Sequence, residues 1–189
     1  KLTIDNSYTY NFPSGASYTL DVNNVTGNGR LDLNDNRMLV RGNIDVQDLG
    51  TKDAKINFID NTASPSKQSI ENFQEVSELV INNSAGVRIF STNDMTVHTE
   101  LILKNGFLEL PSGVNLITDN ITNNGGSIRA IRNVALPKGW RQLASPITTT
   151  FSNFLDGTTT QGFTGADLTD NTLQPNVLWY KEDATGTDN

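Results

Sequence analysis

Cysteine is absent from this chain, and histidine occurs once, at His98. Without cysteine there is no disulfide and no thiolate ligand for zinc, and a single histidine does not complete a histidine-based metal site. We therefore expect no metal ion and no cofactor. The absence of thiols also fits a bacterial exported protein.

Positive charge and long apolar runs are also scarce. Lys and Arg number 14 against 21 Asp and Glu, which gives a net charge of −7. Nucleic acids and anionic membrane surfaces both attract basic faces, so neither is an expected partner. No stretch approaches the roughly 20 consecutive apolar residues that span a bilayer, and Lys1 leads directly into a strand pattern rather than a signal peptide. We expect no membrane insertion, and we interpret the chain as a fragment of a longer protein.

Asn, Asp, Thr, Gly and Ser are abundant, and these are the residues of turns and corners. Between residues 31 and 117 they separate short apolar triplets, several of which alternate in, out and in as a strand with one buried face does. Examples are Leu31-Asp32-Leu33, Ile44-Asp45-Val46, Ile56-Asn57-Phe58, Val87-Arg88-Ile89 and Leu108-Glu109-Leu110. Each triplet is too short for an ordinary β-sandwich strand.

The triplets recur with a common spacing. One series has intervals of 25, 23 and 22 residues and two others have intervals of 21: Leu31, Ile56, Leu79 and Leu101; Val87 and Leu108; Met95 and Leu116. Three interleaved series with one period predict three strands per turn of a coil. The fold class that we predict is all-β, a right-handed parallel β-helix with three short strands in each rung of about 22 residues. Leu31, Ile56, Leu79 and Leu101 should then stack in one inward column.

Two observations qualify this prediction. Residues 60–75 break the rhythm, so we expect an excursion from the coil there. Short strands separated by turns also describe a β-sandwich of antiparallel hairpins, which stays open as the alternative fold. Within residues 1–117 the tight Asn-Gly hairpin signal occurs only at Asn28-Gly29 and Asn105-Gly106, which favours the coil.

The rhythm changes after Ile128. Residues 128–147 read as two strands across a turn at 137–139, residues 148–176 are polar, and residues 177–180 read as a further strand. We therefore expect two domains: a β-helix solenoid over residues 1–127, and part of a second β-rich module, the truncated start of a β-sandwich-like domain, over residues 128–189.

Three motifs in this second part resemble a known class of proteins. They are Gly139-Trp140-Arg141-Gln142-Leu143-Ala144-Ser145-Pro146, Gln161-Gly162-Phe163-Thr164-Gly165-Ala166 and Pro175-Asn176-Val177-Leu178-Trp179-Tyr180. They are similar to the GW-x-x-L-x-SP strand, the QGF/TGA loop and the aromatic strand that follow β-rich repeats in large cell-surface proteins of the Bacteroidetes. The specific resemblance covers about residues 128–182, and residues 1–127 are similar only in style.

The resemblance implies an export route and a kind of role. Such proteins are typically exported by the type IX secretion system and include gliding-motility adhesins. For this chain it implies a place at the bacterial cell surface and a non-enzymatic role in adhesion or as a repeat spacer. The implied partners are cell-surface or secretion-apparatus proteins and surface polysaccharide. The alternative is a secreted β-helical carbohydrate-active enzyme, a polysaccharide lyase or hydrolase, or a carbohydrate-binding module.

Few residues qualify as a chemical site, and we expect no catalytic residue. His98 should face solvent, and no nucleophile can be paired with it by sequence. The segment Asp32–Asn36 places oxygen atoms at alternate positions, as calcium loops do, but Arg37 stands where such a loop needs glycine. Its structural interpretation is a corner between two rungs, with Asn side chains bonded to the turn backbone. The loop Asp167–Asn171, with Asp167 and Asp170, offers a similar weak signal.

Carboxylates and aromatic residues supply the remaining candidates. Asp45 and Asp48 have the chemistry that glycosidic cleavage requires of a carboxylate pair, although a solvated acidic face explains them equally. Trp140, Trp179 and Tyr180 are the sharpest candidates for contact with a carbohydrate or a partner, because aromatic rings stack on sugars. Their alternative role is packing inside the second module.

Overall fold

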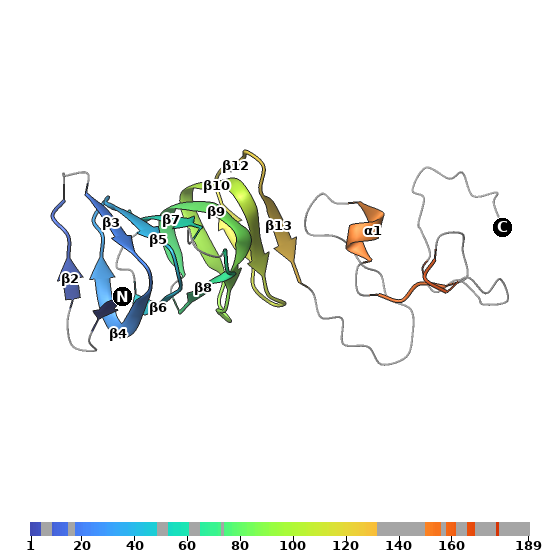
Figure 1. Cartoon of the computed structure of the whole chain (residues 1–189), viewed down its shortest axis with the longest axis horizontal. Helices are drawn as coiled ribbons and strands as arrows, with labels where there is room; N and C mark the ends of the chain where they lie inside the picture. Colours follow the sequence, from blue (N-terminus) through green and yellow to red (C-terminus); the bar gives the residue numbers. More distant parts are fainter. Residues whose placement is uncertain are drawn as a thin grey trace. The chain divides into compact units, whose positions relative to one another are not determined.

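The structure is a computed structural model, and it describes residues 1–4, 9–14, 18–48, 53–60, 65–72, 74–131, 150–155, 158–161, 166–168 and 177. The chain divides into two compact units, Lys1–Lys138 and Gly139–Asn189. Regular structure in the described residues is almost entirely β-strand (Figure 1). The elements are β1 (Leu2–Ile4), β2 (Thr9–Asn11), β3 (Thr19–Val22), β4 (Val25–Asp32), β5 (Arg37–Val40), β6 (Ile44–Asp48), β7 (Lys55–Ile59), β8 (Gln68–Glu71), β9 (Glu75–Ile89), β10 (Met95–Leu110), β11 (Leu116–Thr118), β12 (Ile121–Asn123), β13 (Ser127–Ala130) and helix α1 (Phe151–Phe154).

The strands of the first unit wind into a parallel β-solenoid of about five turns. Each turn has three faces, which follow one another along the chain. The first face holds β1, the start of β4, β6, β8, the ends of β9 and β10, and β13. The second face holds β2, the end of β4, the starts of β9 and β10, and β11. The third face holds β3, β5, β7, the middles of β9 and β10, and β12. The predicted all-β parallel coil is therefore confirmed.

The core is made of side chains that stack in columns from rung to rung. On the first face the parallel register aligns Leu2, Val25, Ile44, Ile70 and Ile89. On the third face it aligns Leu20, Met38, Ile56, Leu79, Leu101 and Ile121. The inner members of both columns are fully buried, so each rung hides its apolar face against its neighbours, as a solenoid requires.

Most of the predicted inward column is correct, with one error. Ile56, Leu79 and Leu101 do stack, and the predicted pairs of Val87 with Leu108 and of Met95 with Leu116 are in register. Leu31 was wrongly placed: it pairs with Tyr10 on the second face, and Met38 stacks beneath Ile56. The third-face intervals are 18, 18, 23, 22 and 20 residues. A period taken from the later rungs is therefore longer than the interval between the first rungs.

The predicted excursion over residues 60–75 is also too wide. Strand β8 lies within that stretch, yet it pairs with β6 and β9 on the first face. The sequence does not reveal β8 as a strand of the coil, because Gln68 and Ser69 are polar although both are buried. Gln68 donates to the Val40 carbonyl at 3.0 Å and accepts from Asn83 at 2.6 Å, so its amide is satisfied inside the coil.

Corners between faces are built from asparagine and glycine. The backbone N–H of Asn43 donates to Asn24 Oδ1 at 2.7 Å, and the N–H of Ser69 donates in turn to Asn43 Oδ1 at 3.0 Å. Gly106 in β10 has φ of 75°, and a Cβ there would lie 1.8 Å from the Asn83 carbonyl oxygen. Gly86 and Gly106, both with positive φ, lie at bends by which β9 and β10 run around all three faces.

The coil extends slightly beyond residue 127. Strand β13 pairs with β10 through Ala130, so residues 128–130 form a first-face strand of the coil. The remainder of the expected second module lies mostly outside the described residues. Within the second unit, α1 and a parallel bridge between Gln161 and Leu168 are described. No helix in the described parts of the chain is long and apolar enough to cross a membrane.

Candidate binding surface

An outward column on the first face brings charged side chains of consecutive rungs together. The register aligns Ser69, Arg88, Glu109 and Arg129 on four consecutive rungs. They point outward because their neighbours along each strand, such as Val87 and Ile89, are buried in the core. We call the charged members of this column, with the cation and aromatic rings that contact them, the Arg–Phe strip, which comprises Lys67, Arg88, Phe90, Phe107, Glu109 and Arg129.

Glu109 lies at the centre of the strip and is only 7% exposed. Its Oε2 accepts a hydrogen bond from Lys67 Nζ at 3.1 Å, and its Oε1 lies 3.1 Å from Arg88 Nε. The Arg88 contact is an ion pair and not a hydrogen bond, since Nε–H finds no acceptor among the described residues. A buried carboxylate thus holds two cations from the two preceding rungs in place.

Two aromatic rings support the cations of the strip. The Arg129 guanidinium lies 3.6 Å from the centroid of the Phe107 ring, and the Arg88 guanidinium lies 4.5 Å from that of Phe90. Both distances are within the range of cation–π attraction. Phe107 in turn covers Gly86, where a Cβ would lie 2.6 Å from the ring. Gly86 has φ of 85°, so glycine suits this position on two grounds.

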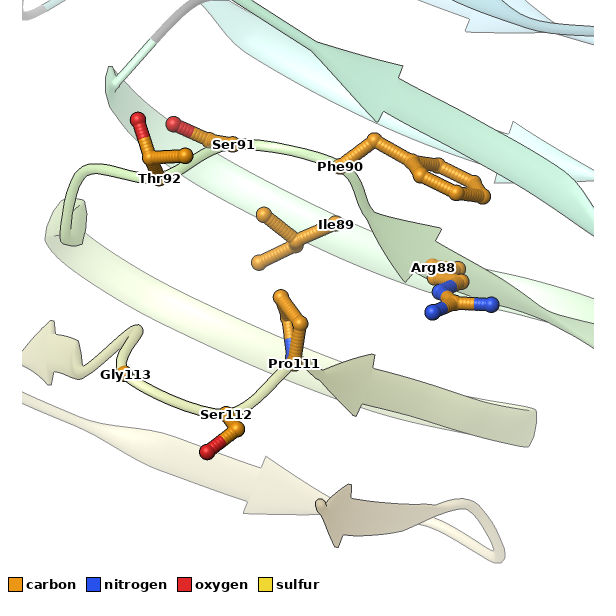
Figure 2. A pocket seen from close by; sticks show the side chains of 8 residues that line it. All are labelled: Arg88, Ile89, Phe90, Ser91, Thr92, Pro111, Ser112 and Gly113. Atoms are coloured by element: carbon orange, nitrogen blue, oxygen red, sulfur yellow. The ribbon is translucent and has the colours of Figure 1, made fainter. Parts of the chain in front are cut away.

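A shallow depression of about 300 Å³ adjoins the strip where the first face ends. Figure 2 shows two loops, with Ser91 and Thr92 in one and Ser112 and Gly113 in the other. Ile89 and Pro111 lie between the loops, and Arg88 and Phe90 flank one end. Phe90 is 53% exposed. The depression therefore combines hydroxyl groups, an open aromatic ring and a guanidinium, which are groups that bind polar ligands.

The aromatic candidates from the sequence, Trp140, Trp179 and Tyr180, lie outside the described residues. Nothing in the structure therefore brings them together or separates them.

The segment Asp32–Asn36 forms the corner between the second and third faces, where the chain passes from β4 to β5. Asn34 and Asp35 have φ of 43° and 65°, which is the left-handed region that Asn and Asp tolerate. The buried Asn36 amide donates to the carbonyls of Pro13, Leu33 and Asn34, and Asn34 Nδ2 donates to Phe12. These amides bond the turn backbone, as the structural interpretation expected.

The other polar candidates have local partners. His98 Nε2 lies 2.9 Å from Glu75 Oε2 on the second face, and Asp45 accepts from Asn72 Nδ2 at 2.7 Å. The side chain of Asp48 is not described. Hydrogen bonds from the N–H and hydroxyl of Thr160 hold the pKa of Asp167 below its ordinary value, while Asp170 lies outside the described residues. In the parts of the chain that are described, no three His, Cys, Asp or Glu side chains converge as metal ligands would.

Sequence reasoning missed the Arg–Phe strip, although a signal was present. Arg88 and Glu109 are the middle residues of two of the apolar triplets, and they lie one period of 21 residues apart. In a coil such residues become cross-strand neighbours, so opposite charges at that spacing predict a rung-to-rung ion pair. No protein-family model, no curated protein and no solved structure matches the chain.

Proposed function

We propose that this chain is a structural and adhesive segment of a large bacterial cell-surface protein. In this role the coil acts as a repeat spacer or binding stalk and catalyses no reaction. Export by the type IX secretion system and partners among surface proteins, the secretion apparatus and surface polysaccharide belong to the same proposal. Its support beyond the fold is the sequence resemblance in residues 128–182.

The observation that carries the proposal is the rung-by-rung construction of the coil. Each turn contacts only its neighbours and adds ~4.8 Å along the axis, so length grows in proportion to the number of rungs. Ion pairs also join neighbouring rungs on the outside, such as Arg88 with Glu109. A spacer needs length and lateral stiffness, and a stacked coil supplies both.

The test is made in cells that produce the parent protein. An in-frame deletion of residues 1–130 should weaken surface attachment or gliding, and antibodies against the coil should label intact cells. A second strain replaces the coil by an unrelated coil with the same number of rungs. Restored attachment would identify a spacer, whereas continued loss would identify a binding stalk. Detection of the protein only inside the cells would contradict the proposal.

The second candidate function is carbohydrate binding or processing by a secreted β-helical protein. The Arg–Phe strip favours its binding form, because an exposed ring beside cations and hydroxyls suits a sugar. A screen of the purified chain for release of reducing or unsaturated ends from polysaccharides tests the enzymatic form. We expect no release.

A further inference from the structure

We propose that the Arg–Phe strip and the adjoining depression form a binding site for an acidic polysaccharide whose sugar units carry carboxylates. This inference rests on the proposed function, because it names the ligand class that an adhesive coil would hold.

The local charge opposes the charge of the whole chain. The chain carries −7, yet three cations of the strip, Lys67, Arg88 and Arg129, gather around one carboxylate, Glu109. Glu109 is buried and already bound to two cations. Arg129 is exposed, and no ion pair joins it to a carboxylate within the described residues. The outer surface of the strip therefore attracts anions in an otherwise acidic molecule.

The geometry of Arg129 favours a carboxylate over other anions. The contact with Phe107 holds the Arg129 guanidinium 3.6 Å from the ring centroid, and the exposed side chain can turn N–H donors toward a ligand. A planar fork of donors matches the two oxygens of a carboxylate in a bidentate pair. Arg88 is held in the same way on Phe90, so the strip presents two guanidinium groups that are already ordered.

The depression favours a sugar as the carrier of that carboxylate. Phe90 is 53% exposed, and one wide apolar ring is what the C–H face of a pyranose packs against. Thr92 and Ser112 are exposed on the two loops that line the depression, so hydroxyl-bearing residues flank a ligand placed there. The site is open and shallow, which fits a chain that lies across the surface.

The spacing of the two arginines sets the length of the ligand. Arg88 and Arg129 are two rungs apart in the register, or ~9.6 Å along the axis at the usual strand separation. We expect a sugar beside Phe90 and Arg88 to need a following unit to bring a carboxylate to Arg129. The site therefore takes an oligomer, with one unit against Phe90 and a later carboxylate on Arg129.

The experiment measures binding to the intact chain by calorimetry, with a trimer of galacturonic acid as the probe. The neutral trimer of galactose tests whether binding needs the carboxylate. Monomeric galacturonate tests whether it needs more than one sugar unit, and a short polyglutamate peptide tests whether it needs the sugar. We expect the acidic trimer to bind at least tenfold more tightly than each of these three control ligands. Its affinity should fall as the salt concentration is raised.

Substitutions test which residues bind the acidic trimer. Arg129→Gln should weaken binding of the acidic trimer about tenfold, because a charge-assisted pair is lost. Phe90→Ala should weaken this binding about threefold to tenfold. Both side chains are exposed, so circular dichroism should show an unchanged coil. Arg37→Gln is the matched control: it removes the same charge from the third face, where Arg37 pairs with Glu78, and should change the affinity less than twofold.

Three results would overturn the site. They are equal affinity for the neutral and acidic trimers, equal affinity for polyglutamate and the acidic trimer, or an equal loss of affinity from Arg37→Gln and Arg129→Gln. None of these touches the proposed function, which is judged by attachment of cells. Conversely, a coil that binds the trimer at Arg129 but whose deletion leaves attachment unchanged would keep the site and refute the adhesive role.

Discussion

Leu101 shows how a single side chain contributes to the coil. It is fully buried in the third-face column, with Leu79 on the preceding rung and Ile121 on the following one. Leu101→Ala should lower the free energy of unfolding by ~2–5 kcal/mol, through lost transfer energy and an unfilled cavity. Urea unfolding followed by circular dichroism measures the change.

The matched control for Leu101 is Ile117, an aliphatic side chain of the last described turn that is 53% exposed. Ile117→Ala should cost less than about 1 kcal/mol, because most of that side chain already contacts water. Equal losses from the two substitutions would mean that burial in the column does not decide stability.

Asp21 and Arg41 give the coil a pH-sensitive pair at the level of single residues. Arg41 donates from Nε to Oδ1 at 3.0 Å and from a terminal nitrogen to Oδ2 at 2.9 Å. These hydrogen bonds, with the guanidinium charge, hold the pKa of Asp21 below its ordinary value despite some desolvation. The pair therefore stabilises the folded chain above the unfolded pKa of the carboxyl, and this contribution is lost as pH falls through the lower folded pKa.

Carboxyl chemical shifts across a pH titration measure this effect. We expect Arg41→Gln to raise the pKa of Asp21 toward its ordinary value, and Arg37→Gln, which removes a different arginine from the same face, to leave it unchanged. A pKa of Asp21 that is unaffected by Arg41→Gln would assign the shift to another cause.

Strand β10 shows how an element depends on its corners. At Gly106, with φ of 75°, an added Cβ would lie 1.8 Å from the Asn83 carbonyl oxygen on the neighbouring rung, so backbone would have to move. At Gly113, in the loop after β10, φ is 87° but no atom lies within 4 Å of the added Cβ. Gly106→Ala combines strain with a clash, whereas Gly113→Ala carries strain alone.

We expect Gly106→Ala to cost more than about 3 kcal/mol and Gly113→Ala about 1–2 kcal/mol. Thermal and urea unfolding of both variants decide between a clash-dominated and a strain-dominated effect. Similar losses in the free energy of unfolding for the two variants would show that the Asn83 backbone can move at little cost in free energy.

The elements also show what the sequence could and could not reveal. Apolar triplets at a fixed period predicted the parallel coil, and they located the columns of the later rungs, because there the intervals are close to constant. Leu31 was wrongly assigned because the first rungs are shorter, with intervals of 18 residues that put Met38 in the column. Strand β8 was missed because a buried Gln68–Asn83 pair replaces apolar residues.

The candidate site was harder to predict than the fold. Arg88, Glu109 and Arg129 become neighbours only when three rungs are stacked in the correct register, so their link is set by the coil and not by local sequence. The exposure of Phe90 likewise depends on where the first face ends. The aromatic residues that stood out in the sequence lie in the second part of the chain, outside the described residues.

At the scale of the whole molecule, the chain divides into two compact units, Lys1–Lys138 and Gly139–Asn189. In a solenoid, damage at one rung spreads mainly to its neighbours. Leu101→Ala should therefore speed native-state hydrogen exchange in β9, β10 and β12. Trp179→Ala, in the second unit, should leave exchange in these strands unchanged. If Trp179→Ala unprotects residues 79–117 as strongly as Leu101→Ala does, the two units share one core.

The parallel pairing of the strands has a mechanical consequence. Hydrogen bonds between rungs lie along the coil axis, so tension between the two ends of the coil loads every interface in series. Such a load peels rungs from an end one at a time instead of shearing many bonds together. Each released rung of roughly 20 residues frees about 70 Å of chain. A coil of this kind, placed between a cell and a surface, would act as a tether that lengthens in steps and dissipates a sudden pull before the attachment itself breaks.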